Sequence, residues 1–368
     1  MDFTLSEAEI EIRERAARFS DRELIPHAAR FDREHALPPP VLLKLAKAGF
    51  SQMAIPKELG GSGLGPVSYS LALSEIARGC ASTAVIMSVT NMVGEIIWKF
   101  GTQEQREKYL PKLGSGEFPT ASFSITEPNA GSDVRAITTR ATLRGDRYIL
   151  KGEKVFVTSG RTSPVIVVIA VTGSGPPKEI SAFIVEKNLP GLRVGKSEEK
   201  MGLLASDTVE LLFDDCAVPT GALLGELGQG FKIGMTALDS GRIGIASQAI
   251  GIAEAAYRSA CANFPSEHLE DLKGEIEAAR WLTLRAAWLK EQGKPFTRQA
   301  STAKLFATET ATRVCQQLLS LAGIEGQLND SPLERHYRDV RVTTLYEGTS
   351  EIQKLVIARS LIKEGFQI

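Results

Sequence analysis

The segment Phe123-Ser124-Ile125-Thr126-Glu127-Pro128-Asn129-Ala130-Gly131-Ser132-Asp133 lies near the start of the region that decides the fold. Its first five residues alternate as in a strand, so Phe123, Ile125 and Glu127 share one face. The proline, glycine, serine and aspartate that follow predict a turn rich in hydroxyl and backbone N–H groups. Such a turn can hold an anion or the polar edge of a flat ring. The alternative is ordinary core followed by a turn.

From about residue 118 to 224, short alternating stretches are separated by Gly and Pro, which predicts strands. No helical pattern of ten residues interrupts them, so we expect an antiparallel β domain and not a Rossmann unit. The expected strands include 136–143, 147–150, 154–158, 165–171, 180–186 and 209–213.

Helical periodicity occupies both flanks, from about residue 6 to 112 and from 231 to 363. The order is therefore α, β, α, with domains at 1–115, 116–228 and 229–368. The glycine-rich stretch 60–65 follows no expected strand and lacks a P-loop lysine, so we expect a loop that does not bind phosphate. Ser88 and Glu95 interrupt an apolar helix at 82–99. Part of that helix is expected to face a cavity, unless Glu95 is simply solvated or paired.

Composition excludes several classes of function. The chain has 368 residues, 43% apolar and 24% charged, with a net charge of -1. This balance gives no electrostatic footprint for nucleic acid or an anionic membrane. No apolar run reaches 18 residues, and the N-terminus does not read as a signal peptide. The cysteines and histidines lack metal-ligand spacing, so we expect no metal and buried free thiols in a reducing cytosol. They are Cys80, Cys216, Cys261, Cys315, His27, His35, His268 and His336.

Two further stretches carry candidate chemistry. Thr344-Leu345-Tyr346-Glu347-Gly348-Thr349-Ser350-Glu351-Ile352 places a carboxylate between an aromatic residue and a glycine. Glycine permits close approach of another molecule, and a desolvated glutamate there could act as a general base near neutral pH. An exposed Glu-Gly turn is the ordinary alternative. In Lys154-Val155-Phe156-Val157-Thr158-Ser159-Gly160, an aromatic ring and a hydroxyl two residues apart could contact a flat heterocycle.

Taken together, these motifs resemble the acyl-CoA dehydrogenase family, and the short-chain (butyryl-CoA type) members above all. The matching elements also include Asp239-x-x-Arg242 and the stretches 238–246 and 334–339. The resemblance covers nearly the whole chain. It implies an α+β fold with an N-terminal helical domain, a middle antiparallel β domain and a C-terminal four-helix bundle.

The resemblance also implies roles for matched positions. Glu347 would remove the substrate α-proton, and its backbone N–H would polarise the thioester carbonyl. Gly348 would allow the substrate to approach, and Tyr346 would form a wall of the acyl pocket. Arg242 would brace the catalytic region, and Asp239 would meet the pantetheine. Residues expected at FAD are Phe123, Ile125, Thr126, Phe156 and Thr158 at the flavin ring, Ser132 near the phosphates or the pantetheine, and Thr349 and Glu351 from a neighbouring subunit.

The expected activity is FAD-dependent desaturation of a short or compact acyl-CoA to the trans-2,3-enoyl-CoA. Electrons would pass to an electron-transferring flavoprotein, and the enzyme would be cytoplasmic, or mitochondrial if a transit peptide has been removed. Bulky Met87, Ile97 and Tyr346 would limit the cavity. Gly241 cannot supply an alternative base, and the stretch 82–88 lacks an arginine for a dicarboxylic substrate.

Three alternatives remain open. They are desaturation of a cyclic or aryl-substituted acyl thioester, possibly on a carrier protein; non-catalytic binding of flavin or acyl-CoA; and a flavin monooxygenase. Retention of Glu347 beside Gly348 counts against the second, and the third does not need Glu347.

Two stretches depart from the family pattern. The region 262–272 lacks an Arg-x-x-Phe-Gly segment and is about nine residues short, or two to three turns at about 3.6 residues per turn. The stretch 320–326 has Ser320 and Ile324 where the family has Gln and Gly. Because the resemblance assigns both segments to the FAD of a neighbouring subunit, we expect weaker FAD binding, and a dimer becomes an alternative to the family's tetramer.

Overall fold

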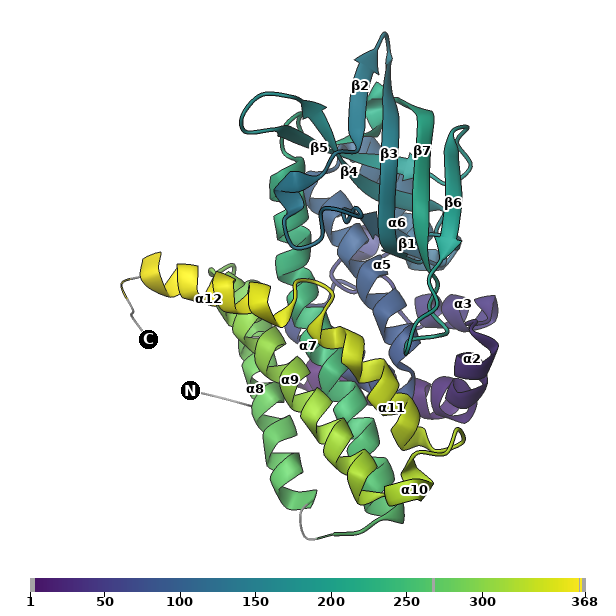
Figure 1. Cartoon of the computed structure of the whole chain (residues 1–368), viewed down its shortest axis with the longest axis vertical. Helices are drawn as coiled ribbons and strands as arrows, with labels where there is room; N and C mark the ends of the chain where they lie inside the picture. The colour runs from purple at the N-terminus through teal and green to yellow at the C-terminus, as the bar shows by residue number, and fades with distance from the viewer. Residues whose placement is uncertain (1–3, 267–268, 364, 366–368) are drawn as a thin grey trace.

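The computed structural model describes residues 4–266, 269–363 and 365. A β-sheet domain occupies one end of the elongated molecule and a bundle of long helices the other, with the N-terminal helices packed beside both (Figure 1). The predicted order α, β, α is thus confirmed. Glu267 and His268, within the shortened region, lie outside the described residues, as does the extreme N-terminus.

The N-terminal helices begin where the sequence supplies caps. Ser6 caps the first helix in a capping box with Glu9, and the third begins at Pro39, whose fixed φ suits a first helical turn. The elements are α1 (Glu7–Phe19), η1 (Ser20–Leu24), η2 (Ile25–His27), α2 (Ala28–Glu34), α3 (Pro39–Lys47), η3 (Lys57–Leu59), α4 (Pro66–Gly79), α5 (Ala81–Phe100) and α6 (Gln103–Ser115).

The middle part forms an eight-stranded sheet in the order β6-β7-β3-β2-β4-β5-β8, with β1 paired to β4. Its elements are β1 (Ala121–Ser124), η4 (Val134–Ala136), β2 (Arg140–Arg144), β3 (Arg147–Thr158), β4 (Val165–Gly173), β5 (Glu179–Glu186), β6 (Leu192–Ser197), β7 (Thr208–Pro219), η5 (Thr220–Ala222) and β8 (Leu223–Leu224).

The sheet corrects the sequence prediction in three respects. It is mixed, because β1 runs parallel to β4 and one parallel bridge joins β2 to β4. The two strands expected at 147–150 and 154–158 form one strand, β3, because Gly152 adopts φ 141° where the register shifts. The strand expected from residue 136 begins at Arg140, because Asp133 caps the short helix η4 through the N–H of Arg135.

Long helices form the C-terminal part, and α7, α8, α9 and α11 lie together as the bundle in Figure 1. The elements are α7 (Gly230–Asn263), α8 (Leu269–Glu291), α9 (Thr297–Leu321), α10 (Gly323–Gly326), α11 (Pro332–Arg341), η6 (Val342–Thr344) and α12 (Ser350–Lys363). We propose domain boundaries at 115/116 and 228/229, within the connections that precede β1 and α7.

Helix α7 positions the site because it contacts all three parts of the chain. It packs on α4 and α5, on β4 and β5, and on α8, α9 and α11. Close packing is possible because α7 carries glycines at its contacts. A Cβ on Gly251, for example, would stand 2.2 Å from the carbonyl oxygen of Ser74 on α4. The long 34-residue helix therefore ties the sheet to the bundle.

Helix α5 is long and apolar enough to cross a membrane, but 83% of its most hydropathic window is buried inside the protein, as in a core helix. All four cysteines are free, yet Cys261 is exposed, which contradicts the prediction that all are buried. Cys261 lies in the last turn of α7, where the neighbouring residues are exposed as well.

Candidate active site

Glu347 lies in the short connection between η6 and α12, in a strained backbone conformation. Its φ is 55°, in the left-handed region that residues with side chains rarely adopt, and Gly348 follows at φ 90°. Lys304 on α9 donates to the Gly348 carbonyl at 2.7 Å. The Gln353 amide donates to the carbonyls of Glu347 and Gly348 at 3.1 and 2.9 Å. These bonds hold the strained loop in place.

The carboxylate of Glu347 is directed into the protein. Its Oε2 is enclosed and has no hydrogen-bond partner among the described residues. Burial raises the pKa of Glu347 to about 7, while the positive charges of Arg242 and Lys304 partly oppose that rise. A carboxylate that titrates near neutral pH and has an unused oxygen is suited to accept a proton from a bound molecule.

Arg242 and Asp239 lie on one face of α7, next to this loop. Arg242 is buried and pairs with Asp239 at 2.5 Å, and within the described part of the chain its Nε has no hydrogen-bond partner. Asp239 also accepts from the Thr297 hydroxyl at 2.7 Å. The structure therefore brings Arg242 near Glu347, and Asp239 is linked to it through the ion pair. The proposed contact of Asp239 with pantetheine stays a prediction.

Tyr346 turns into the bundle instead of toward solvent. Its hydroxyl donates to the side-chain oxygen of Gln248, and the Gln248 amide donates to the carbonyl of Ala81 at 2.9 Å. Burial raises the pKa of Tyr346 well above its ordinary value, so the hydroxyl stays neutral. The predicted place of Tyr346 in the wall of the acyl pocket stays a prediction.

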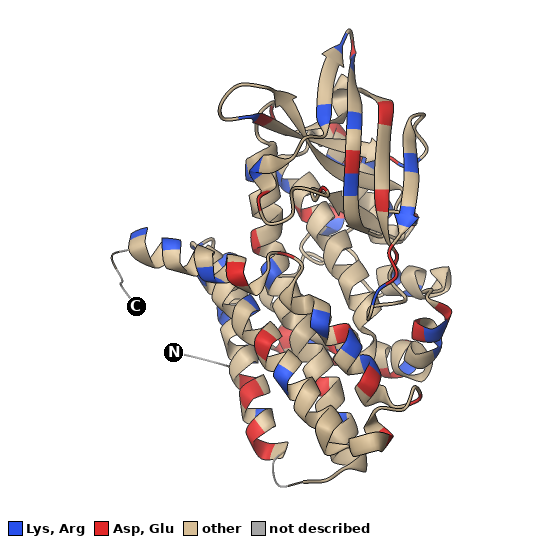
Figure 2. Ribbon diagram, in the orientation of Figure 1, with Lys and Arg blue, Asp and Glu red and all other residues tan. Residues whose placement is uncertain are grey.

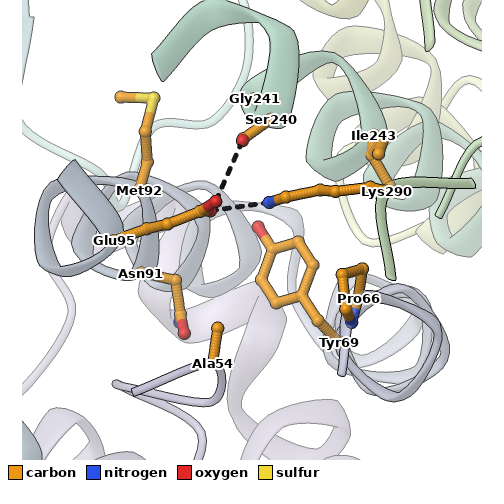
Figure 3. A pocket seen from close by; sticks show the side chains of 10 residues that line it. All are labelled: Ala54, Pro66, Tyr69, Asn91, Met92, Glu95, Ser240, Gly241, Ile243 and Lys290. Carbon is orange, nitrogen blue, oxygen red and sulfur yellow. Dashed lines mark hydrogen bonds and ion pairs between the residues drawn. The ribbon is translucent and has the colours of Figure 1, made fainter. Parts of the chain in front are cut away.

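A narrow hollow adjoins Glu347 between α4, α5, α7 and α8, and part of it is open to solvent (Figure 3). Gly241 joins the two, because it lines the hollow and a Cβ there would stand 2.4 Å from Oε2 of Glu347. The other lining residues are Ala54, Pro66, Tyr69, Asn91, Met92, Glu95, Ser240, Ile243 and Lys290.

Helix α5 presents a different face to this hollow than the sequence prediction assumed. Met87 is fully buried among the N-terminal helices, and Ile97 is fully buried against the β domain. Neither lines the hollow, whereas Met92 and Glu95 do. At about 3.6 residues per turn, Ile97 lies about half a turn past Glu95 and points away from the hollow, whereas Met87 lies about two turns before Glu95 and packs among the N-terminal helices. The predicted cavity beside Glu95 is confirmed, and Glu95 is also paired.

The residues predicted at the flavin ring come from two neighbouring segments of the β domain. The backbone N–H of Val155 donates to the carbonyl of Thr126 at 2.9 Å, and the buried ammonium of Lys154 donates to the carbonyl of Ile125 at 3.0 Å. These bonds bring the Phe123–Thr126 end of one segment against the Phe156–Thr158 end of the other. The buried Ile125 also touches α7, because a Cβ on Gly234 would lie 3.1 Å from its Cδ1.

The exposed surface there suits a flat ring. Phe156 is 63% exposed at φ 56°, next to a shift in the β3–β7 register, so a bulge turns an aromatic side chain outward. Thr126 and Thr158 are half-buried beside it. Ser132 and Gly131 lie exposed in the following turn, where no described atom beyond the adjoining residues comes within 4 Å of a Cβ on Gly131. The residues present therefore fit FAD, with room for its phosphates near Ser132.

Thr349 and Glu351 lie at the start of α12, which packs on α9 and projects sideways from the bundle (Figure 1). The Thr349 hydroxyl accepts from the Ile352 N–H at 3.4 Å, and Glu351 is exposed. Their expected contact with FAD of a neighbouring subunit stays a prediction. Among residues 4–266, 269–363 and 365, no cluster of three His, Cys, Asp or Glu side chains could hold a metal ion.

Sequence reasoning missed Lys304, Gln353, Tyr69 and Lys290. One signal was available for Lys304, since it interrupts a small-residue stripe at Ala300, Ala303, Ala307 and Ala311 that has helical spacing. A lysine in such a stripe must find a buried acceptor. Tyr69 and Lys290 gave no local signal, because their partners Ser88 and Glu95 lie 19 and 195 residues away. Gln353 bonds carbonyls only five and six residues before it, but a single glutamine in a helix does not predict such bonds.

The comparisons with known proteins agree with this architecture. The N-terminal, middle and C-terminal domains of acyl-CoA dehydrogenase match residues 6–117, 122–216 and 228–362. The mitochondrial short-chain specific acyl-CoA dehydrogenase of Bos taurus is 45% identical over 372 residues, which cover 96% of this chain and 89% of the relative.

Two solved structures are also similar. Butyryl-CoA dehydrogenase from Megasphaera elsdenii has a TM-score of 0.95 and 38% identity, covering 98% of this chain and 100% of that one. A chain in the structure of the electron transferring flavoprotein of Acidaminococcus fermentans has a TM-score of 0.96 and 39% identity, covering 99% and 100%. Three matched domains over nearly the whole length, with this degree of identity, establish that the chain belongs to the acyl-CoA dehydrogenase family.

Proposed function

We propose that the protein is an FAD-dependent oxidoreductase that converts a short or compact acyl-CoA into its trans-2,3-enoyl-CoA. The similarity to a short-chain enzyme and to butyryl-CoA dehydrogenase supports the substrate class. An electron-transferring flavoprotein is the proposed electron acceptor, and a similar chain occurs in the structure of such a protein. The enzyme works as a homotetramer or a dimer, in the cytoplasm or, after loss of a transit peptide, in the mitochondrial matrix.

The observation that carries this proposal is the carboxylate of Glu347. It is enclosed, its pKa is raised to about 7, and its Oε2, beside a hollow, finds no hydrogen-bond partner in the part of the chain that the structure describes. A structural glutamate would instead be paired or solvated. Glu347 therefore takes the α-proton of the thioester at Oε2, and its backbone N–H polarises the thioester carbonyl.

The other residues of the site position the reactants. FAD, when bound, supplies the acceptor for the hydride that leaves the β-carbon. The flavin ring is held by Phe123, Ile125, Thr126, Phe156 and Thr158. Ser132 holds the phosphates of FAD or the pantetheine of the substrate. Lys304 and Gln353 fix the loop of Glu347, and Tyr346 forms a wall. Gly348 leaves space for the substrate, Arg242 braces the loop from α7, and Asp239 meets the pantetheine.

An anaerobic titration tests the proposal. Butyryl-CoA should bleach the flavin absorbance of the purified protein in stopped-flow measurements. Glu347→Gln keeps the shape of the side chain and removes the base, so the rate should fall about 10³-fold or more while bound flavin stays. Bleaching of the variant at the wild-type rate would show that Glu347 is not the base.

The same titration separates the alternatives. A non-catalytic flavin or acyl-CoA binder, or a monooxygenase, should not be bleached by butyryl-CoA without oxygen. A desaturase of cyclic or aryl-substituted thioesters should respond to those compounds and ignore butyryl-CoA.

A further inference from the structure

One side of the hollow carries an ion pair. Lys290, in the last turn of α8, lies 2.7 Å from Oε2 of Glu95 on α5, and the Ser240 hydroxyl donates to Oε1 of Glu95 at 3.3 Å. Figure 3 shows these three side chains meeting on one side of the hollow. The lysine and glutamate side chains are 18% and 19% exposed, so the pair is largely removed from water.

The rest of the hollow is mostly apolar. Ala54, Pro66, Met92 and Ile243 form its walls together with the ring of Tyr69. The Tyr69 hydroxyl donates to the Ser88 hydroxyl at 3.1 Å. An alkyl chain can therefore lie against these walls without stranding a buried polar group.

The ion pair lies close to the base. Ser240, which bonds Glu95, and Gly241, which faces Glu347, are consecutive in α7, where the rise is about 1.5 Å per residue. Tyr69 interacts electrostatically with both Glu95 and Glu347. A chain that extends from Glu347 along the hollow thus reaches the pair after only a few carbons.

An apolar chain end and a polar chain end should behave differently there. A methyl group pressed against the pair would exclude water and offer no hydrogen bond in return, which is unfavourable for both charges. A hydroxyl group can accept from the ammonium, which has three donors, and can donate to the carboxylate. A carboxylate would face Glu95 as well as Lys290, so it gains little from a site whose charges cancel.

We propose that Glu95 and Lys290 determine acyl specificity, by rejecting alkyl chains long enough to reach them and accepting chains of that length that end in a hydroxyl group. This inference rests on the proposed function, because it assigns the substrate class of the same site. It defines the substrates as short alkanoyl-CoAs and somewhat longer ω-hydroxyacyl-CoAs.

A matched pair of thioesters tests the proposal. 6-Hydroxyhexanoyl-CoA and heptanoyl-CoA have acyl chains with the same number of non-hydrogen atoms and differ by hydroxyl against methyl. We expect kcat/KM at least tenfold higher for the hydroxy compound. In the double variant Glu95→Leu/Lys290→Met the preference should disappear or reverse. The control Glu275→Leu/Arg313→Met removes an ion pair of 2.7 Å between α8 and α9, and its preference should match the wild type.

Measurements of thioester binding distinguish a failure of this inference from a failure of the proposed reaction. Glu347→Gln protein is not expected to turn over, and calorimetry on it gives Kd for the two thioesters. Tenfold tighter binding of 6-hydroxyhexanoyl-CoA supports the inference even if butyryl-CoA fails to bleach the wild-type flavin, a result that would overturn the proposed reaction. Equal affinities, or an unchanged preference in the Glu95→Leu/Lys290→Met protein, would mean that the pocket limits length by shape alone and would overturn the inference.

Discussion

A Cβ on Gly241 would stand 2.4 Å from Oε2 of Glu347, so helix α7 and the loop of the base meet at a point that has room only for glycine. Real Cβ atoms do not approach an oxygen so closely. Any larger residue at 241 must therefore displace the carboxylate, since the helix around it is buried. The identity of residue 241 thus fixes where the base can be.

Gly241→Ala should lower the rate of flavin reduction by butyryl-CoA roughly 10- to 100-fold, because a shift of about 1 Å in a catalytic group can change the rate by that much. Flavin content should be retained. Gly274→Ala, on α8, is the matched control, because among the described residues no atom outside its own stretch of helix lies within 4 Å of its added Cβ. If the flavin of the Gly241→Ala protein is reduced at the wild-type rate, Glu347 tolerates the methyl group and the prediction is wrong.

Lys304→Met should shift the pH dependence of the reaction. The ammonium holds the Gly348 carbonyl at 2.7 Å, and its charge lowers the pKa of Glu347. Without it, the pKa of Glu347 should rise further, and kcat/KM at pH 7 should fall at least tenfold, since a charged hydrogen bond of this kind contributes about 1.5–3 kcal/mol.

A pH profile distinguishes this role from simple damage to the fold. Loss of stability alone would leave the midpoint unchanged, whereas loss of a positive charge raises it. Lys354→Met, at an exposed position on α12, removes a lysine elsewhere and should keep the wild-type midpoint. If Lys304→Met keeps that midpoint too, its charge does not tune the base.

Local patterns predicted the layout of the domains and the motifs, because hydrophobic period and Gly or Pro punctuation are properties of neighbouring residues. The pairing of Glu95 with Lys290 joins positions 195 residues apart, and no sequence pattern near either residue predicts it. The outward turn of Phe156 likewise depends on the register of β3 against β7. Apolar Met87 and Ile97 were placed in the pocket wrongly, because composition identifies core residues without saying which face of a helix meets which neighbour.

Binding of FAD and assembly form a third prediction. Loss of charge-assisted hydrogen bonds to the diphosphate should make the binding free energy of FAD less favourable by about 1.5–3 kcal/mol for each bond. The purified protein should therefore release FAD on dilution more readily than family members that have the longer segment. The connection between the end of α7 at Asn263 and the start of α8 at Leu269 is short. A dimer is therefore an expected alternative to a tetramer. Analytical ultracentrifugation with flavin absorbance measures both, and a tetramer with one FAD per chain at nanomolar concentration would contradict the prediction.

The pH dependence of the wild-type enzyme follows from the raised pKa of Glu347. The base accepts a proton only when ionised, and its pKa in the folded protein is about 7. The value of kcat/KM, which reports the free enzyme, should therefore increase about tenfold per pH unit below 7 and level off above it. A flat profile between pH 5.5 and 8 would contradict the assignment.

The same pKa has a consequence for stability that can be measured without substrate. Because the folded pKa of about 7 lies above the unfolded value of about 4.3, the folded state binds this proton more tightly. The stabilisation that the proton gives is fully present below about pH 4.3 and is lost as pH rises through 7. Glu347→Gln has no such proton to lose, so its melting temperature relative to wild type should rise between pH 5 and 8. A constant difference across that range would show that Glu347 titrates normally, and the pH profile of the reaction would then need another group.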